Sequence, residues 1–197
     1  ERSEDELSNL AEIGSIAAKD AIKNAKMNPN QIDAVIVACS NLERPYPAIA
    51  IEIQNALGID GYAYDMLVGC SSTTFAINNA YSDIASGLAD TVLVVNPEIS
   101  TPAVNFAKRD IHFIFGDGCV ATIVKKDSKS EKTFKIIDRK LITKFSNNIR
   151  SDWSYLSRTA TDHKTEEELL FYQNGNSVFK EVCPLVAEFI STQLDKN

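Results

Sequence analysis

Up to residue 124, apolar residues follow two different patterns of spacing. Steps of three and four residues, the period of an amphipathic helix, mark the segments 8–26, 47–58 and 77–88. Short continuous apolar runs, typical of buried strands, occupy 32–38, 62–68 and 91–96. Because helices and apolar strands alternate, the pattern predicts an α/β fold with a largely parallel, buried sheet. Pro47 is expected to be the first residue of its helix, and Gly58 to close it.

The pattern is less regular in the second part of the chain. Two apolar runs, 111–115 and 119–124, are joined by Gly116-Asp117-Gly118, which predicts a hairpin or two strands around a tight turn. The polar stretch 127–132 is the best internal boundary, and it separates a first half, 1–126, from a second segment, 133–197. The later elements are expected to be a strand over 134–142, a long polar loop over 146–164, a helical turn opened by Thr165, and a helix from about residue 176 that Pro184 kinks or splits.

Cys70 lies where the strand 62–68 turns into the helix that follows it. Four small hydroxyl residues come directly after it, and they would let a substrate approach closely. The free N–H groups and the dipole at a helix N-terminus favour an anion, so a thiol there has a lowered pKa and more of the nucleophilic thiolate. The alternative is that Cys70 is a small buried apolar residue, as free cysteines often are.

Composition narrows the classes of function. The 197 residues are 44% apolar and 24% charged, with a net charge of −7 and no basic run, which argues against nucleic acid or an anionic membrane as the main partner. No run of 18 apolar residues occurs, so no membrane span is expected. Four widely spaced cysteines and only two histidines argue against a zinc site. Cysteines spaced in this way, without a disulfide pattern, are typical of a reducing cytoplasm. The charged beginning, ERSEDELSN, is typical of the middle of a longer chain.

Several segments, taken together, resemble one enzyme family along nearly the whole chain. They are IDAVIVACSN, PAIAIEIQNALGI, YDMLVGCSSTTFAI, TVLVVNPE, KRDIHFIFGDGCVATIV and GNSVFKEV. In this order they resemble the type III β-ketoacyl-acyl-carrier-protein synthases of the thiolase superfamily, the initiating condensing enzymes of fatty-acid synthesis. The resemblance implies a homodimer in which two similar halves pack as an α-β-α-β-α sandwich. It also implies that a first strand and helix precede Glu1 and that most of the second half follows Asn197.

The resemblance implies a reaction in two stages. Cys70 would take an acyl group from acyl-CoA, and malonyl-acyl-carrier protein would then lose carbon dioxide and attack the acyl-enzyme. No metal or cofactor is implied beyond these substrates. The family's catalytic histidine and asparagine lie in motifs that this sequence lacks, and His112 and His163 occur in other contexts. The 197 residues alone are therefore expected not to complete the condensation.

The resemblance also assigns binding roles to six residues. They are Arg109, Ile114, Phe115, Gly175, Val178 and Tyr46. Arg109 would pack against the CoA adenine, and Tyr46 would reach across the dimer to the neighbouring acyl pocket. The other four would line the acyl and pantetheine tunnel. The plainer alternatives are an exposed loop charge for Arg109, an exposed loop tyrosine for Tyr46, and strand core for Ile114 and Phe115.

The sequence departs from the family pattern in two places. The usual Ala-Cys-Ser/Ala-Gly is Gly69-Cys70-Ser71-Ser72 here, and the usual GDGAGA is GDGCVA. Both changes could reshape the acyl pocket, so the length of the starter chain stays open, as does the acceptor, carrier protein or CoA. A thiolase or a 3-hydroxy-3-methylglutaryl-CoA synthase fits less well. A non-catalytic acyl-CoA-binding paralogue and an inactive fragment are the remaining alternatives.

Overall fold

The computed structural model describes residues 6–109, 111–127, 133–152 and 165–197. The chain divides into two compact units. The first, called the sheet unit, comprises Glu1–Ile99 and Asp117–Phe134. The second, called the α5 unit, comprises Ser100–Gly116 and Lys135–Asn197. The predicted boundary at 127–132 falls largely on residues 128–132, outside the described part of the chain, and it stays a prediction.

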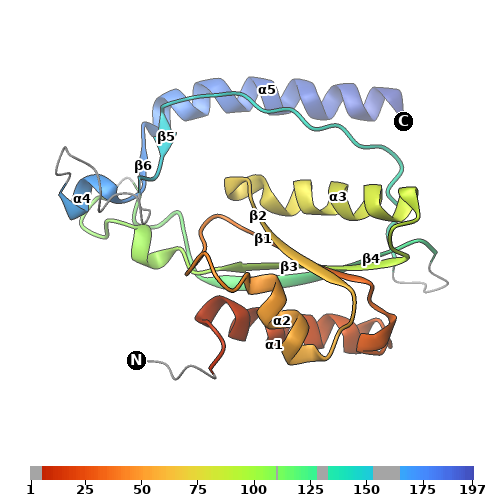
Figure 1. Ribbon diagram of the computed structural model, residues 1–197. Helices are drawn as coiled ribbons and strands as arrows, with labels where there is room; N and C mark the ends of the chain where they lie inside the picture. The colour runs from red at the N-terminus through yellow and green to blue at the C-terminus, as the bar shows by residue number, and fades with distance from the viewer. Residues whose placement is uncertain (1–5, 110, 128–132, 153–164) are drawn as a thin grey trace. The chain divides into compact units, whose positions relative to one another are not determined.

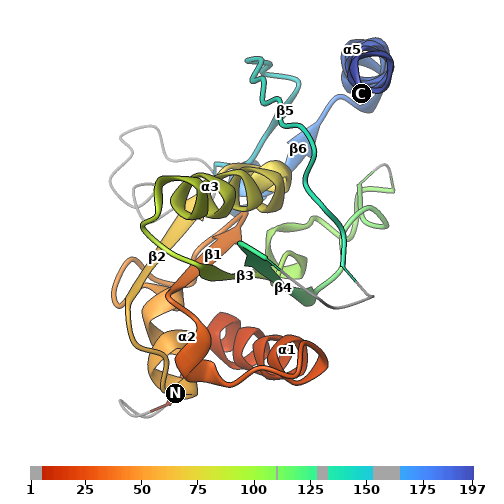
Figure 2. The ribbon, with the colours of Figure 1, turned by 90° about the vertical axis from the view of Figure 1, so that its right-hand side faces the viewer.

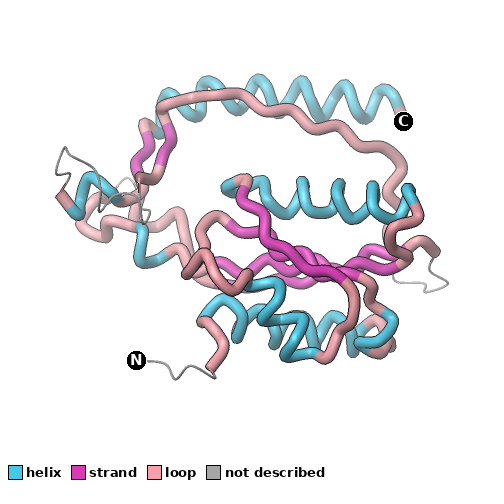
Figure 3. Tube along the Cα trace, viewed as in Figure 1, coloured by secondary structure: helices cyan, strands magenta, loops and turns pink. Residues whose placement is uncertain are grey.

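The sheet unit is built on four strands in the order β2-β1-β3-β4 (Figures 1 and 3). Their bounds are β1 Ala34–Cys39, β2 Tyr62–Leu67, β3 Thr91–Glu98 and β4 Gly118–Lys125. β1 runs parallel to β2 and to β3, with Ala34 in register with Tyr62 on one side and with Val92 on the other. β4 runs antiparallel to β3. The predicted, largely parallel sheet is therefore confirmed.

Helices cover both faces of this sheet (Figure 2). α1 Asn9–Asn24 and α2 Ile49–Leu57 pack on one face, against a core that includes Val35, Val37 and Leu93. α3 Ser72–Ser86 packs on the other, where Ala76 and Ala80 meet the opposite side chains of β1 and β3. Short 3-10 turns, η1 Pro29–Gln31 and η2 Gly69–Ser71, precede β1 and α3. Burial of alternating strand side chains on both faces explains why β1 and residues 92–95 of β3 are continuously apolar.

Local signals set the helix ends of the sheet unit. The Ser8 hydroxyl accepts a hydrogen bond from Ala11 N at the start of α1. Gly58 and Gly87 close α2 and α3 in the left-handed conformation, as expected for glycine at these positions. The prediction that Pro47 begins a helix is wrong by two residues. The Asp65 carboxylate accepts from Ile49 N and Ala50 N at 2.8 Å, and these two bonds place the start of α2 after Ala48.

The α5 unit contains one long helix and a small two-stranded sheet. Its elements are η3 Thr101–Ala103, β5 Ile149–Arg150, α4 Glu166–Leu169, β6 Tyr172–Gln173 and α5 Gly175–Lys196. β5 pairs with β6 antiparallel, and Phe171 N donates to Ala103 O at 2.8 Å. α5 stays one helix of 22 residues, so Pro184 does not split it. The predicted helical turn at Thr165 is confirmed: Thr165 N donates to the Glu168 carboxylate at 2.7 Å in a capping box.

Two predicted strands are wrong. Residues 111–114 form turns, and Phe113 is 71% exposed, so the expected hairpin does not form and β4 pairs with β3 instead. Residues 133–146 form no regular element in the structure. Asp138 in this stretch accepts a hydrogen bond from Lys196 Nζ near the end of α5 at 2.7 Å, and the backbone has no partner strand among the described residues. An apolar run becomes a strand only where another strand satisfies its backbone groups.

The loop predicted over 146–164 is partly tested. It contains β5, and residues 153–164 lie outside the described residues. No helix among the residues described is long and apolar enough to cross a membrane.

Candidate active site

Cys70 lies on an exposed corner between β2 and α3, as the sequence predicts. β2 ends at Leu67, and Gly69 turns the chain with φ +56°, in the left-handed region that favours glycine. Cys70 is the middle residue of the 3-10 turn η2, and α3 begins two residues later. This position puts the thiol directly ahead of a 15-residue helix, whose first N–H groups have no acceptor within the helix.

A buried hydroxyl holds this corner to the sheet. Ser72 is 2% exposed, and its Oγ accepts from Val68 N at 2.7 Å. The same oxygen lies 2.7 Å from Gly69 O and 3.0 Å from Cys39 O, either of which can accept its proton. Gly69 and Ser72 are two of the positions at which the sequence departs from the family pattern. The contact between Ser72 Oγ and Gly69 O joins these two positions.

Further polar groups gather at the carboxyl ends of β1 and β3. The Glu98 carboxylate accepts from Ser40 N at 2.8 Å and from the Ser40 hydroxyl at 3.1 Å, while burial raises the pKa of Glu98. Asn96 Nδ2 donates to Ala38 O at 2.9 Å inside the core. In open α/β sheets, ligands bind beyond the carboxyl ends of the strands. Cys70 follows β2 at this same edge of the sheet. Sequence reasoning missed Ser40, Asn96 and Glu98, although each follows or ends an apolar run.

The remaining thiols have different surroundings. Cys39 is fully buried in β1, and burial, with smaller contributions from Glu98 and Asp65, raises its pKa to about 12. Burial also raises the pKa of Cys119 to about 11. Both therefore stay protonated near neutral pH, and a protonated thiol is a poor nucleophile. Cys183 is exposed on α5. Of the four, Cys70 alone combines exposure with a strand-to-helix corner.

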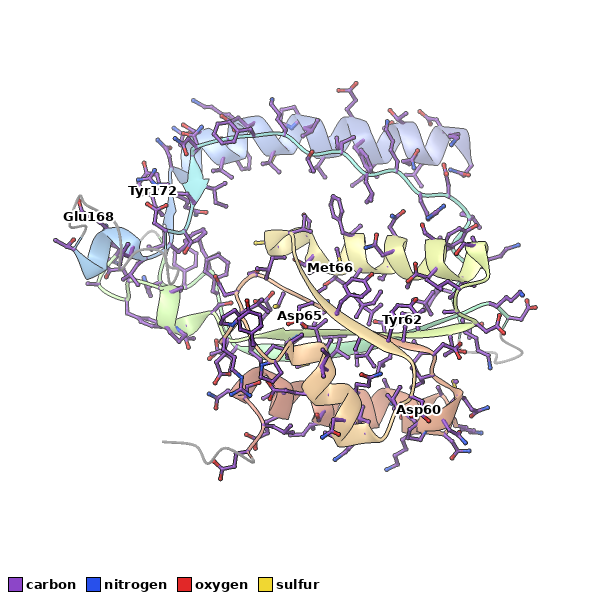
Figure 4. All side chains as sticks on the ribbon, viewed as in Figure 1. Asp60, Tyr62, Asp65, Met66, Glu168 and Tyr172 are labelled. Carbon is purple, nitrogen blue, oxygen red and sulfur yellow. The ribbon has the colours of Figure 1, made fainter. Side chains whose placement is uncertain are left out.

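Tyr46 extends from a well-anchored loop of the sheet unit. Its side chain is 84% exposed. In the same loop, just before Tyr46, Glu43 accepts from Leu10 N at 3.3 Å, and Arg44 pairs with the buried Glu52 at 2.8 Å. Tyr46 follows β1 and Cys70 follows β2, so both lie beyond the carboxyl ends of adjacent parallel strands. Figure 4 labels Tyr62, Asp65 and Met66, which show the course of β2 toward this end.

The five other predicted site residues belong to the α5 unit. Arg109 is exposed beside the turns 111–114, and Ile114 is exposed within them. The alternative reading of Ile114 and Phe115 as strand core is wrong, because no strand forms there. Phe115 is half-buried, and its ring meets that of Phe171 edge to face at a centroid distance of 4.7 Å.

The start of α5 supplies the last two predicted residues, which are Gly175 and Val178. Gly175 is the first residue of the helix and is exposed, while Val178 is half-buried in the first turn. The backbone bond from Phe171 N to Ala103 O links this region to the segment that carries Arg109 and Phe115. The α5 unit thus groups these residues, and their binding roles stay predictions.

Comparisons with known proteins place the chain among condensing-enzyme relatives. Residues 64–144 match the family model described as 3-oxoacyl-[acyl-carrier-protein (ACP)] synthase III. The chain is 50% identical over 199 residues to the β-ketodecanoyl-[acyl-carrier-protein] synthase of Pseudomonas aeruginosa, a match that covers 100% of the chain and 57% of the relative. The chain is related to the type III 3-oxoacyl-[acyl-carrier-protein] synthases. The synthase III of Brucella anthropi is 31% identical over 188 residues, 93% of this chain and 56% of its own.

Solved synthase III structures share the fold. The enzyme from Pseudomonas aeruginosa PAO1 superposes with a TM-score of 0.76 at 21% identity, over 94% of this chain and 55% of its own. The enzyme from Thermus thermophilus gives a TM-score of 0.64 at 25% identity, over 90% and 54%. The predicted thiolase-like α/β fold is thereby confirmed. The chain spans about 57% of the length of the first of its synthase relatives.

Proposed function

We propose that the protein carrying this chain is a β-ketoacyl-acyl-carrier-protein synthase of type III, an acyltransferase of fatty-acid biosynthesis. The Cys70 thiolate attacks the thioester carbonyl of an acyl-CoA, the CoA thiolate leaves, and the acyl group stays on sulfur. Malonyl-acyl-carrier protein then loses carbon dioxide, and its carbanion attacks the Cys70 thioester. The products are 3-oxoacyl-acyl-carrier protein and the free Cys70 thiolate.

One observation carries this proposal. An exposed cysteine on the turn leading into a long helix provides the nucleophile that acyl transfer requires. The family comparison supports the same chemistry, because residues 64–144 include this turn. Decarboxylation also needs donors for an enolate oxygen, which the family supplies from a histidine and an asparagine. Their motifs do not occur in this sequence, so we expect these 197 residues alone to stop at the acyl-enzyme.

The starter chain is proposed to be of medium length. The relative that is 50% identical is named for a β-ketodecanoyl product, which has ten carbons. The condensation adds two carbons, so a starter of eight carbons gives that product. The exposed, turn-forming segment around Ile114 and the half-buried Phe115 are proposed to border the acyl chain.

The proposal includes partners and a location. The substrates are acyl-CoA and an acyl carrier protein, and no cofactor or metal takes part. The enzyme acts as a homodimer, with the exposed Tyr46 reaching the neighbouring acyl pocket and Arg109 packing against the CoA adenine. Four cysteines without a disulfide pattern support a cytoplasmic location.

The test is intact-protein mass spectrometry of the full-length protein after incubation with acyl-CoAs of two to sixteen carbons. We expect one acyl adduct, largest with octanoyl-CoA, that disappears in Cys70→Ala. Cys183→Ala, which removes the other exposed thiol, is the matched control and keeps the adduct. A folded protein that gains no adduct from any acyl-CoA would instead be a non-catalytic paralogue.

A further inference from the structure

The Ser72 hydroxyl touches the peptide group that contains the Cys70 nitrogen. Gly69 C=O and Cys70 N–H belong to one planar trans peptide, so the two bonds point in opposite directions. Gly69 O lies 2.7 Å from Ser72 Oγ and also accepts from Ser72 N. When the hydroxyl proton points to Gly69 O, the shorter of its two contacts, this carbonyl is held by two donors and cannot rotate freely. Fixing the Gly69 carbonyl therefore also fixes the direction of the Cys70 N–H.

The hydroxyl itself is fixed by the sheet. It accepts from Val68 N and lies 3.0 Å from Cys39 O, the last residue of β1. Ser72 is 2% exposed, so water does not compete for these positions. The Ser72 side chain points back toward the corner, so its hydroxyl bonds to groups that precede α3. A hydrogen bond to the Gly69 oxygen polarises the whole peptide and makes the Cys70 N–H a stronger donor.

Acyl transfer gives such a donor a task. When the thiolate adds to the acyl carbonyl, the carbonyl electrons move to oxygen and form an oxyanion, which collapses as the leaving group departs. Donors fixed in advance stabilise this oxyanion more than donors that must reorient. We propose that Ser72 is a positioning residue that aims the Cys70 N–H at this oxyanion. The inference rests on the proposed function only in taking Cys70 as the nucleophile.

Two small electrophiles separate this role from general support of the corner. Acylation of Cys70 by 4-nitrophenyl acetate passes through an oxyanion, whereas alkylation by iodoacetamide displaces iodide and forms none. Both rates are measured on the full-length protein over a range of pH, with modification assigned to the Cys70 peptide by mass spectrometry. The variants are Ser72→Ala, Ser72→Thr, which keeps the hydroxyl, and Ser71→Ala, the same truncation one residue earlier on an exposed side chain.

We expect Ser72→Ala to slow acylation about tenfold while alkylation changes less than about twofold, a smaller loss than removing an oxyanion donor outright causes. Ser72→Thr should recover most of the acylation rate, and Ser71→Ala should match the unaltered protein. An equal fall in both rates, or unaltered protein that is alkylated but never acylated at Cys70, would overturn the inference. A selective fall with 4-nitrophenyl acetate, combined with no adduct from any acyl-CoA, would reject the proposed function and keep the role of Ser72.

Discussion

The two units contain similar apolar sequence but bury it to very different extents. In the sheet unit every residue of β1 is buried, as are seven of the eight residues of β3. In the α5 unit the helix α5 has an apolar stripe at helical spacing, yet none of its residues is buried. The stripe is exposed at Phe179, Val182, Val186, Ile190 and Leu194. The difference lies in the neighbours: β1 has a strand on each side and a helix layer on each face.

This contrast separates two things that hydrophobic periodicity predicts. The spacing of apolar residues indicates local conformation, and in agreement with its spacing α5 forms a helix of 22 residues. Burial requires in addition a second apolar surface, and free energy is gained in proportion to the area that leaves water. Stability should therefore be concentrated in the sheet unit. Matched substitutions in the two units test this expectation.

The largest expected effect comes from truncating isoleucine. Ile36→Ala, in the fully buried β1, should lower the free energy of unfolding by about 4 kcal/mol, from lost burial and the cavity left behind. Ile190→Ala removes the same atoms from a side chain that is 52% exposed on α5, and should cost about 0.5 kcal/mol or less. Urea unfolding followed by circular dichroism measures both. Similar losses for the two variants would mean that α5 is covered in solution.

Local signals explain which parts of the fold the sequence predicts. Gly58 as a helix end and the Cys70 corner depend on residues within a few positions, and both predictions are confirmed. Ser8 at the start of α1 and Gly87 at the end of α3 act over the same short range. The start of α2 is the exception in this part of the chain, because hydrogen bonds to the Asp65 carboxylate of β2 determine where the helix begins.

Errors occur where distant residues decide the outcome. The runs 111–115 and 134–142 have strand-like composition, but within the described part of the chain neither has a strand beside it to complete its backbone hydrogen bonds. The same holds for the site. Ser72, Asn96 and Glu98 act on backbone groups more than 30 positions away, such as Cys39 O, Ala38 O and Ser40 N, and no short motif records such bonds. Which predicted binding residues meet a ligand depends in turn on contacts that sequence spacing does not encode.

A second matched pair compares backbone packing. Gly61 has φ +109°, and a Cβ there would overlap the Asp33 carbonyl oxygen just before β1. Gly61→Ala should therefore cost on the order of 3 kcal/mol, from backbone strain and displacement of Asp33. Gly175, at the start of α5, has room for a Cβ, whose nearest neighbour would be Gln173 Nε2 at 3.7 Å. Gly175→Ala should be neutral or slightly stabilising, since alanine favours the helix. The contrast fails if differential scanning calorimetry finds equal shifts in melting temperature.

The smallest expected effect is a pH dependence that arises from a buried thiol. The pKa of Cys39 rises from 9.0 to about 12 in the folded protein, chiefly because burial disfavours the thiolate. Between these values the folded state holds a proton that the unfolded chain has lost, so stability falls as pH rises above 9. The loss from this thiol should reach about 1.4 kcal/mol by pH 10.

Comparison of variants isolates this contribution from other groups that titrate at high pH. Cys119 and Tyr62 also have raised pKa values, but they are present in every variant and cancel in the differences. Cys39→Ala should show a shallower loss of stability between pH 8 and pH 10 than the unaltered protein, whatever its stability at pH 8. Cys183→Ala, which removes the exposed thiol of α5, retains Cys39 and should keep the full loss. If the Cys39→Ala curve runs parallel to that of the unaltered protein, the thiol of β1 reaches water in solution, and the sheet unit is less tightly closed than its buried strands indicate.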